Sequence, residues 1–193
     1  MSEQTTIEGI DYGPLAALVG NWEGDKGVDR APEPDGEERN PYYETMVFEA
    51  AGDVTNADKQ TLSIVRYHQV VSRKSNKEVF HDQVGYWLWD LADNTIVECF
   101  TIPRGVAVMA GGNLASPEDI AAPLVFEVAA DASSPEFGIV QAPFMFKQAK
   151  TTAFSHTITI TGDDMRYSQS TVLDIYDKKS YDHTDVNTLR RVN

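Results

Sequence analysis

Runs of β-branched and aromatic residues constrain the fold of this chain more than any other feature. The runs are roughly 6 to 10 residues long and are separated by clusters of turn-forming residues, a pattern typical of β-strands. Ten segments have this character: Tyr42–Glu49, Thr61–Val71, Val79–Trp89, Thr95–Ile102, Val106–Ala110, Leu124–Ala129, Phe144–Lys150, Ala153–Thr161, Met165–Ile175 and Thr184–Val192. The sequence therefore predicts an all-β protein of about ten strands.

The connectors between these segments are short and resemble hairpin turns. Those with the clearest turn chemistry are Ala92–Asn94, Pro103–Gly105, Thr161–Asp164 and Asp177–Ser180. Short connectors of this kind join neighbouring strands in antiparallel pairs. Because a closed barrel leaves no exposed sheet edge, we predict an antiparallel up-and-down β-barrel.

A few segments lack strand character. Residues 1–13 are polar and predict a flexible N-terminus, and Pro14–Val19 predicts a short helix with proline in its first turn. Asp29–Asn40 is rich in acids, prolines and glycine and is expected to be a solvated acidic loop. Ser116–Asp119 carries helix-start signals. The length of 193 residues suits one domain, which we place at residues 14–193.

The charge and the cysteine content exclude several classes of function. The chain has 30 acidic and 16 basic side chains, a formal net charge of −14, which opposes binding to nucleic-acid phosphates or anionic membranes. No apolar stretch is long enough to span a bilayer and no secretion signal is evident, so a soluble, cytoplasmic protein is expected. A single cysteine, Cys99, rules out an internal disulfide.

The segment that begins at Val79 predicts a candidate cavity wall. Alternation places His81, Gly85, Trp87 and Trp89 on one face of this strand, provided that no bulge occurs at Gly85. Such a face describes an aromatic-lined cavity with one imidazole at its mouth. The alternative is that both tryptophans are ordinary core or outer residues and that His81 is a surface histidine.

The remaining sequence signals are weaker. His156 shares a strand face with Ile158 and Ile160 and is expected to be a buried structural residue, whereas the side of the barrel that His68 faces cannot be assigned. The usual local signatures of hydrolases, zinc proteases and nucleotide-binding sites are absent, and the acidic pairs lie in turns. Catalysis by paired carboxylates therefore has no support.

Four segments, taken in order, resemble the nitrobindin family, which comprises small haem-binding β-barrels of lipocalin and fatty-acid-binding-protein shape. The four are Pro14–Gly27, Tyr43–Tyr67, His81–Val106 and Met165–Arg191. The first is similar to a leucine-rich helix followed by G-x-W-x-G-x-G, and the third to the H-x-E-x-G-Y strand and the P-x-G-V hairpin. Two departures are visible: the family's Y-P dipeptide is replaced by a segment holding Pro32 and Pro34, and the stretch 112–154 is longer.

The resemblance implies a haem b cofactor and assigns roles to several residues. His183 corresponds to the C-terminal histidine that binds the iron, with Asp182 or Asp185 as neighbours able to orient its ring. The other residues expected at the cofactor are His81 on the distal side, Trp22, Trp87 and Tyr167 as apolar walls, and Arg104 beside the propionates.

The implied activity is that of a ferric haem protein that binds nitric oxide and isomerises peroxynitrite to nitrate. The expected partners are small molecules (haem, nitric oxide or peroxynitrite) and a second copy of the chain as a homodimer. The alternative is a non-enzymatic barrel that carries a small apolar ligand such as a fatty acid. Hemin titration against a fluorescent lipid separates the two.

Overall fold

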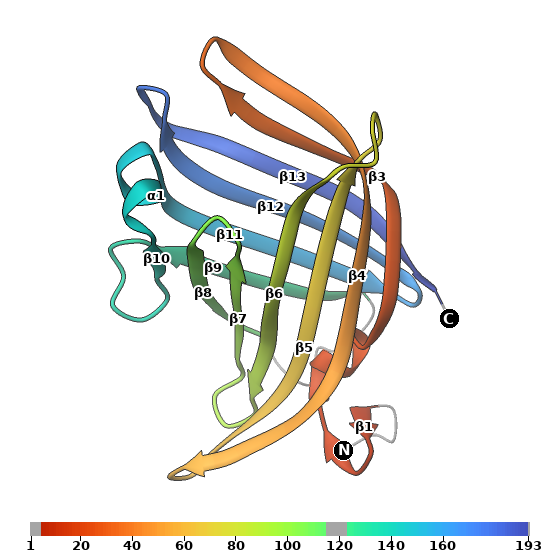
Figure 1. Cartoon of the computed structure of the whole chain (residues 1–193). Coiled ribbons are helices and arrows are strands. Elements are labelled where there is room, and N and C mark those ends of the chain that lie inside the picture. Colours follow the sequence, from red (N-terminus) through yellow and green to blue (C-terminus); the bar gives the residue numbers. More distant parts are fainter. Residues whose placement is uncertain (1–4, 115–122, 193) are drawn as a thin grey trace.

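Antiparallel strands follow one another around a closed barrel (Figure 1). The structure is a computed structural model and describes residues 5–114 and 123–192. Within these residues the barrel has ten strands: β3 (Gly20–Glu33), β4 (Gly36–Ala57), β5 (Gln60–Arg73), β6 (Val79–Asp90), β7 (Thr95–Ile102), β8 (Val106–Asn113), β9 (Leu124–Asp131), β11 (Ala149–Thr161), β12 (Asp164–Ile175) and β13 (Lys178–Val192). The predicted all-β class and up-and-down barrel are confirmed.

The barrel closes at two places, one between its first and last strands and one between β8 and β9. β13 pairs with β3 over a long ladder, and β8 meets β9 at the single pair Gly111 and Ala129. Gly112 permits this second approach, because a Cβ there would lie 2.0 Å from the backbone oxygen of Glu127. A short extra strand, β10 (Ile139–Gln141), pairs with β8.

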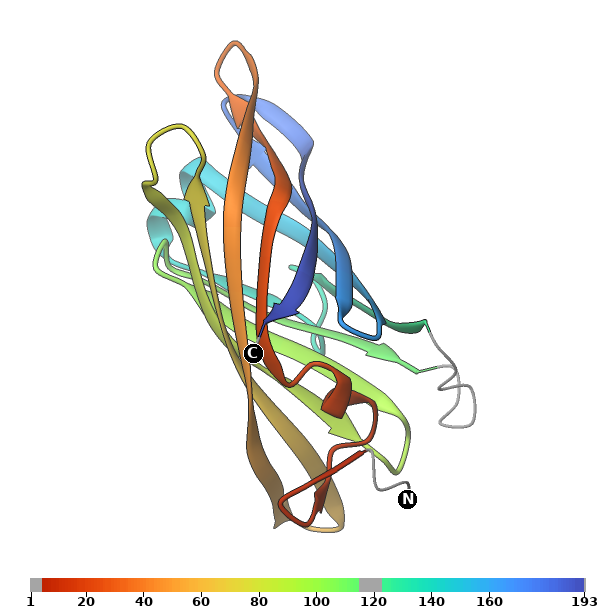
Figure 2. The same ribbon diagram turned by 90° about the vertical axis from the view of Figure 1, so that its right-hand side faces the viewer.

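The N-terminal segment covers one end of the barrel, as Figure 2 shows. It consists of β1 (Thr6–Ile7), β2 (Ile10–Asp11) and the 3₁₀ helix η2 (Gly13–Ala17), which confirms the predicted short helix. The Tyr12 hydroxyl accepts a hydrogen bond from the Gly52 amide at 2.7 Å, and Leu15 and Leu18 are fully buried beneath it. Residues 5–11 therefore form a docked hairpin, which corrects the expectation of a flexible segment over 1–13 for the part described.

The expected acidic loop at 29–40 is wrong: these residues form the outer half of the β3–β4 hairpin. Asp29 pairs with Asn40 and the ladder continues to Glu33 and Gly36. Arg30 is hydrogen-bonded to Glu37 at 2.9 Å across the two strands. Because β13 supplies backbone partners to β3 from its other side, the ladder outweighs the turn-favouring composition.

Two further expectations concern the segment between β8 and β12. Phe144–Lys150 is not a strand: α1 (Pro143–Gln148) occupies most of it, with a proline in its first turn, and β11 begins at Ala149. The helix predicted at Ser116–Asp119 lies outside the described residues. In the part of the chain that is described, no helix has the length and apolar character to cross a membrane.

Candidate functional site

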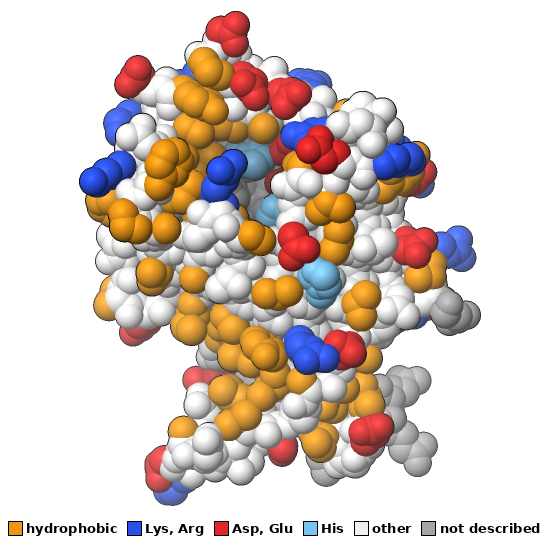
Figure 3. All heavy atoms as spheres, viewed as in Figure 1, with side chains coloured by type: hydrophobic (Ala, Val, Ile, Leu, Met, Phe, Trp, Pro, Cys, Tyr) orange, Lys and Arg blue, Asp and Glu red, His pale blue; other side chains and the backbone are white. Residues whose placement is uncertain are grey.

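A cavity of about 590 Å³ opens at the end of the barrel opposite to η2. Its apolar lining consists of Val79, Phe80, Phe100, Ile102, Pro103, Val106, Val108, Met145, Phe154 and Leu173. Figure 3 shows a hollow in this half of the molecule, with hydrophobic side chains around it and histidine side chains visible inside. The size and lining suit a cofactor or a small apolar molecule.

His183 lies in this cavity wall between two carboxylates. Its Nε2 donates to Oδ1 of Asp29 at 2.6 Å, and Oδ2 of Asp185 lies 3.8 Å from the same nitrogen. The arrangement follows from strand register, since Asp29 on β3 is the cross-strand partner of Asp185 on β13. Nδ1 of His183 has no hydrogen-bond partner among the described residues.

Burial and the neighbouring charges both shift the pKa values of His183 and Asp185. Burial alone would lower the pKa of His183, but the hydrogen bond to Asp29 and the charges of Asp185 and Asp29 outweigh it and raise this pKa above the ordinary imidazole value. Burial raises the pKa of Asp185 to about 7, and the nearby charge of Asp29 adds to the effect. The wall therefore holds a charged cluster whose protons are coupled.

His81 lines the same cavity from β6. Its Nε2 lies 3.2 Å from Oε1 of Gln83, and burial lowers its pKa, so the ring is neutral at neutral pH. The pairing of β6 with β5 is regular from His81 to Asp90, with its one irregularity at Phe80 and no bulge at Gly85, and Gln83, Gly85, Trp87 and Trp89 are all buried. The sequence prediction that His81 shares the inward face with these residues is thus correct.

A layer of buried polar side chains forms the floor beneath the cavity. The Glu44 carboxylate accepts hydrogen bonds from Gln69 at 2.5 Å, from Asn187 at 2.6 Å and from the Tyr167 hydroxyl at 3.0 Å. Tyr167 also contacts the Tyr42 hydroxyl at 2.7 Å. Burial raises the pKa of Glu44 despite these donors, so the group belongs to a low-dielectric interior.

The residues expected at the cofactor are only partly brought together. His81, His183 and Arg104 all line the cavity. Tyr167 lies in the floor, lining an adjoining hollow of about 260 Å³ that shares His81, His183, Asp185 and Gln169 with the cavity.

Neither Trp22 nor Trp87 lines the cavity, which corrects their assignment as cofactor walls. The Trp22 indole donates to the Leu18 carbonyl at 2.8 Å, and the Arg191 guanidinium lies over its ring. Trp87 packs deeper in the barrel, against Phe126. Both tryptophans are fully buried core residues, and Phe80, Phe100 and Phe154 provide the aromatic wall instead.

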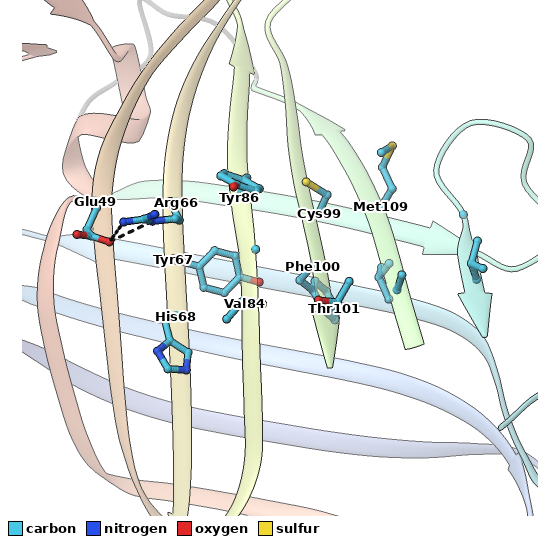
Figure 4. Close-up of a pocket in the computed structure, with 15 residues that line it drawn as sticks. Glu49, Arg66, Tyr67, His68, Val84, Tyr86, Cys99, Phe100, Thr101 and Met109 are labelled. Carbon is cyan, nitrogen blue, oxygen red and sulfur yellow. Dashed lines mark hydrogen bonds and ion pairs between the residues drawn. The ribbon is translucent and has the colours of Figure 1, made fainter. Parts of the chain in front are cut away.

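A second hollow, of about 730 Å³, lies on the outer face of the barrel over β5 to β8 and beside β10 (Figure 4). His68 faces it and contacts the Asp82 carboxylate at 3.3 Å, which answers the question of which side this histidine occupies. Cys99 lines it too, and burial raises the pKa of the thiol, so the sulfur remains protonated. This exterior groove has only His68 as an imidazole and is separate from the cavity.

The comparisons with known proteins decide the family. Residues 11–191 match the family described as "THAP4-like, heme-binding beta-barrel domain". The chain belongs to this family. The resemblance to nitrobindins seen in the sequence is therefore confirmed, and haem is the cofactor of the THAP4-like barrel family to which the chain belongs.

A solved structure shows the same fold. The protein in "Crystal Structure of Rv2717c from M. tuberculosis" aligns with a TM-score of 0.69 and 18% sequence identity, over 93% of this chain and 95% of that one. No curated protein sequence is detectably similar to the chain.

The cavity of this THAP4-like barrel fits a haem. It provides flat aromatic walls, an arginine at its edge for propionates, and a histidine with one ring nitrogen that makes no hydrogen bond to any described residue. The other ring nitrogen is held by Asp29, the carboxylate partner that orients a metal-binding imidazole. The sequence analysis named Asp182 and Asp185 for this role and missed Asp29.

Proposed function

We propose that the chain binds ferric haem b in the 590 Å³ cavity, where His183 would hold the iron. The observation that carries the proposal is that His183, His81 and Arg104 converge on one apolar cavity in a barrel of a haem-binding family. Asp29 holds the ring of His183 and increases its basicity. Arg104 offsets the propionate charge, which the acidic chain otherwise repels.

The proposed activity is binding of nitric oxide and isomerisation of peroxynitrite to nitrate. The bound haem supplies an iron position open to these ligands. The isomerisation conserves all atoms and electrons, so it needs no reductant. The apolar side chains exclude water and retain the reactants, and His81 contacts the ligand from the cavity wall.

Stopped-flow measurement of peroxynitrite decay tests this activity. The haem-loaded protein is expected to accelerate decay and to raise the yield of nitrate above that of free hemin at equal concentration. The haem-free protein is the control and should match buffer. A loaded protein that is no faster than free hemin would exclude the isomerase activity while leaving haem binding intact.

The apolar lining also favours a second candidate, a carrier of fatty acids or similar molecules. A fluorescent fatty acid bound to the haem-free protein is expected to be displaced by hemin at one equivalent, with a Soret shift. Displacement of hemin by the lipid under the same conditions would favour the carrier. Homodimerisation and a cytoplasmic location stay predictions.

A further inference from the structure

A continuous chain of hydrogen bonds runs from the cavity wall into the barrel core. His81 Nε2 lies 3.2 Å from Gln83 Oε1, and Gln83 Nε2 lies 2.6 Å from the Tyr67 hydroxyl. The Tyr67 hydroxyl lies 2.7 Å from Glu98 Oε1, and Glu98 Oε2 lies 2.8 Å from Nδ1 of His156. Gln83, Tyr67, Glu98 and His156 are each at most 4% exposed, so water does not compete for these bonds.

The buried carboxylate sets the direction of every bond in this chain. The Tyr67 hydroxyl donates to Oε1 of Glu98, and Nδ1 of His156 occupies the other oxygen, Oε2. The Tyr67 hydroxyl uses its proton in the bond to Glu98, so its oxygen can only accept the hydrogen bond from Gln83. Gln83 therefore directs its amide NH₂ to Tyr67 and its carbonyl oxygen to His81. That carbonyl needs a donor, so the proton of the neutral His81 ring resides on Nε2.

We propose that Glu98, acting through Tyr67 and Gln83, fixes His81 as a hydrogen-bond acceptor toward the cavity. With Nε2 committed to Gln83, the remaining polar atom of the ring is Nδ1, which has no hydrogen-bond partner among the described residues. Gln83, Tyr67 and Glu98 are thus positioning residues, and none of them needs to touch the ligand of His81.

The orientation of the chain selects a class of ligand. The Nδ1 lone pair accepts a hydrogen bond, so it favours ligands that are donors, such as water, a hydroperoxide or a protonated oxyacid. A ligand that can only accept, such as fluoride, gains nothing from His81. This consequence rests on the proposed function, because it requires haem iron beside His81; the orientation of His81 itself does not.

Two-bond ¹H–¹⁵N correlation spectra of the haem-free protein test the orientation directly. Each ring nitrogen is seen as protonated or bare, and the chain has only 4 histidines to assign. At slightly alkaline pH, His81 is expected to carry its proton on Nε2 and to have a bare Nδ1. A ring protonated on Nδ1, or an even mixture of both forms, would overturn the proposal whether or not haem binds.

The Tyr67→Phe variant tests whether this series of hydrogen bonds determines which nitrogen of His81 carries the proton. It removes only the hydroxyl and keeps the ring that stacks on Phe48 at 5.5 Å. Gln83 then has no fixed acceptor at its nitrogen, so the Nδ1-protonated form of His81 is expected to appear. The matched control is Tyr42→Phe, which removes another buried hydroxyl that is not part of this chain. An unchanged His81 in Tyr67→Phe, or an equal change in the control, would contradict the proposal.

Fluoride titration of the haem-loaded protein adds the functional readout. Because His81 can donate in Tyr67→Phe, fluoride is expected to bind ~2–10-fold more tightly than in the wild type, the worth of one ordinary hydrogen bond. Equal or weaker fluoride binding, in a variant whose His81 form has changed, would overturn the assigned ligand class. Failure of hemin to bind at all would count against the proposed function only, since the spectra of the haem-free protein are independent of it.

Discussion

Two carboxylates face each other across the β3–β13 ladder, and a histidine lies between them. Like charges at directly opposed positions of an antiparallel pair are destabilising. Asp29 escapes part of this cost through its bonds to His183 and to the Asn40 amide at 3.1 Å. Asp185 accepts no hydrogen bond from any described residue, and burial together with the charge of Asp29 raises its pKa. At this scale the site is a compromise between holding His183 and stability.

The Asp185→Asn variant should be more stable than the wild type at alkaline pH. The folded-state pKa of Asp185, about 7, is above its ordinary value of 3.8, so its stabilising contribution is complete below ~4 and is lost as the pH rises through 7. Asparagine is neutral at every pH, so the variant does not lose this stability as the pH rises. Chemical unfolding is expected to show a gain of ~2 kcal/mol at pH ~8 that shrinks toward pH ~5.

A gain that does not depend on pH, or a loss of stability at pH ~8, would contradict this electrostatic account. The control is Asp164→Asn, which changes an exposed acid at the first position of β12 and should alter stability little at either pH.

The sequence could indicate His183 and His81 but not the residues that hold them. His183 emerged from the order of four family-like segments. Asp29 stands 154 positions away, and its role depends on the β13–β3 register, which local patterns do not encode. Trp22 and Trp87 were misplaced for a related reason, since alternation predicts which face is inward but not how deep along the barrel a residue lies.

At the scale of elements, strands with regular alternation were predictable and irregular ones were not. β7 has the predicted bounds, Thr95–Ile102, because its alternation is uninterrupted. β3 was missed, since its glycines and acids mimic a loop and its ladder forms only when β4 and β13 are both in place. In α1, a proline in the first turn outweighs the aromatic residues that favoured a strand.

In the β3–β4 hairpin the Tyr42 ring packs directly on Gly27, its partner in the ladder, and Gly27→Ala should disrupt this contact. A Cβ at Gly27 would lie 2.0 Å from the Tyr42 ring, so the ring must move and lose its contact with the Tyr167 hydroxyl. Thermal or chemical unfolding is expected to show a loss of ~2 kcal/mol. Gly36→Ala in the same hairpin meets open space and should change stability by less than ~0.5 kcal/mol. Equal losses of stability in the two variants would show that the contact between Gly27 and the Tyr42 ring is not the cause.

At the scale of the whole molecule, the closed barrel combines a strongly negative surface with a cavity for an anionic cofactor. The charge of −14 repels the propionates at a distance, although Arg104 offers a local attraction at the cavity edge. The sequence pattern and the family resemblance were enough to predict the barrel fold and a cavity within it. The balance between long-range repulsion and local attraction could not be predicted in this way, because it depends on where the closed barrel places Arg104 relative to the acidic side chains.

The rate of hemin association should increase with ionic strength. Salt shortens the Debye length from ~30 Å at 0.01 M to ~8 Å at 0.15 M and so screens the repulsion between chain and propionates. Stopped-flow absorbance at several salt concentrations measures the rate. The uncharged dimethyl ester of haem is the matched control and should bind at a rate independent of salt. A hemin rate that falls with added salt would mean that local attraction by Arg104 dominates.

Hemin titration of the His183→Ala variant tests the central claim most directly. The wild type is expected to form a Soret band with one equivalent of hemin. His183→Ala should lose that band while keeping an unfolding transition like that of the wild type. His68→Ala, which removes an exposed histidine on the outer face, is the matched control and should titrate like the wild type. An unchanged Soret band in His183→Ala would contradict the assignment of the axial ligand and, with it, the proposed haem site.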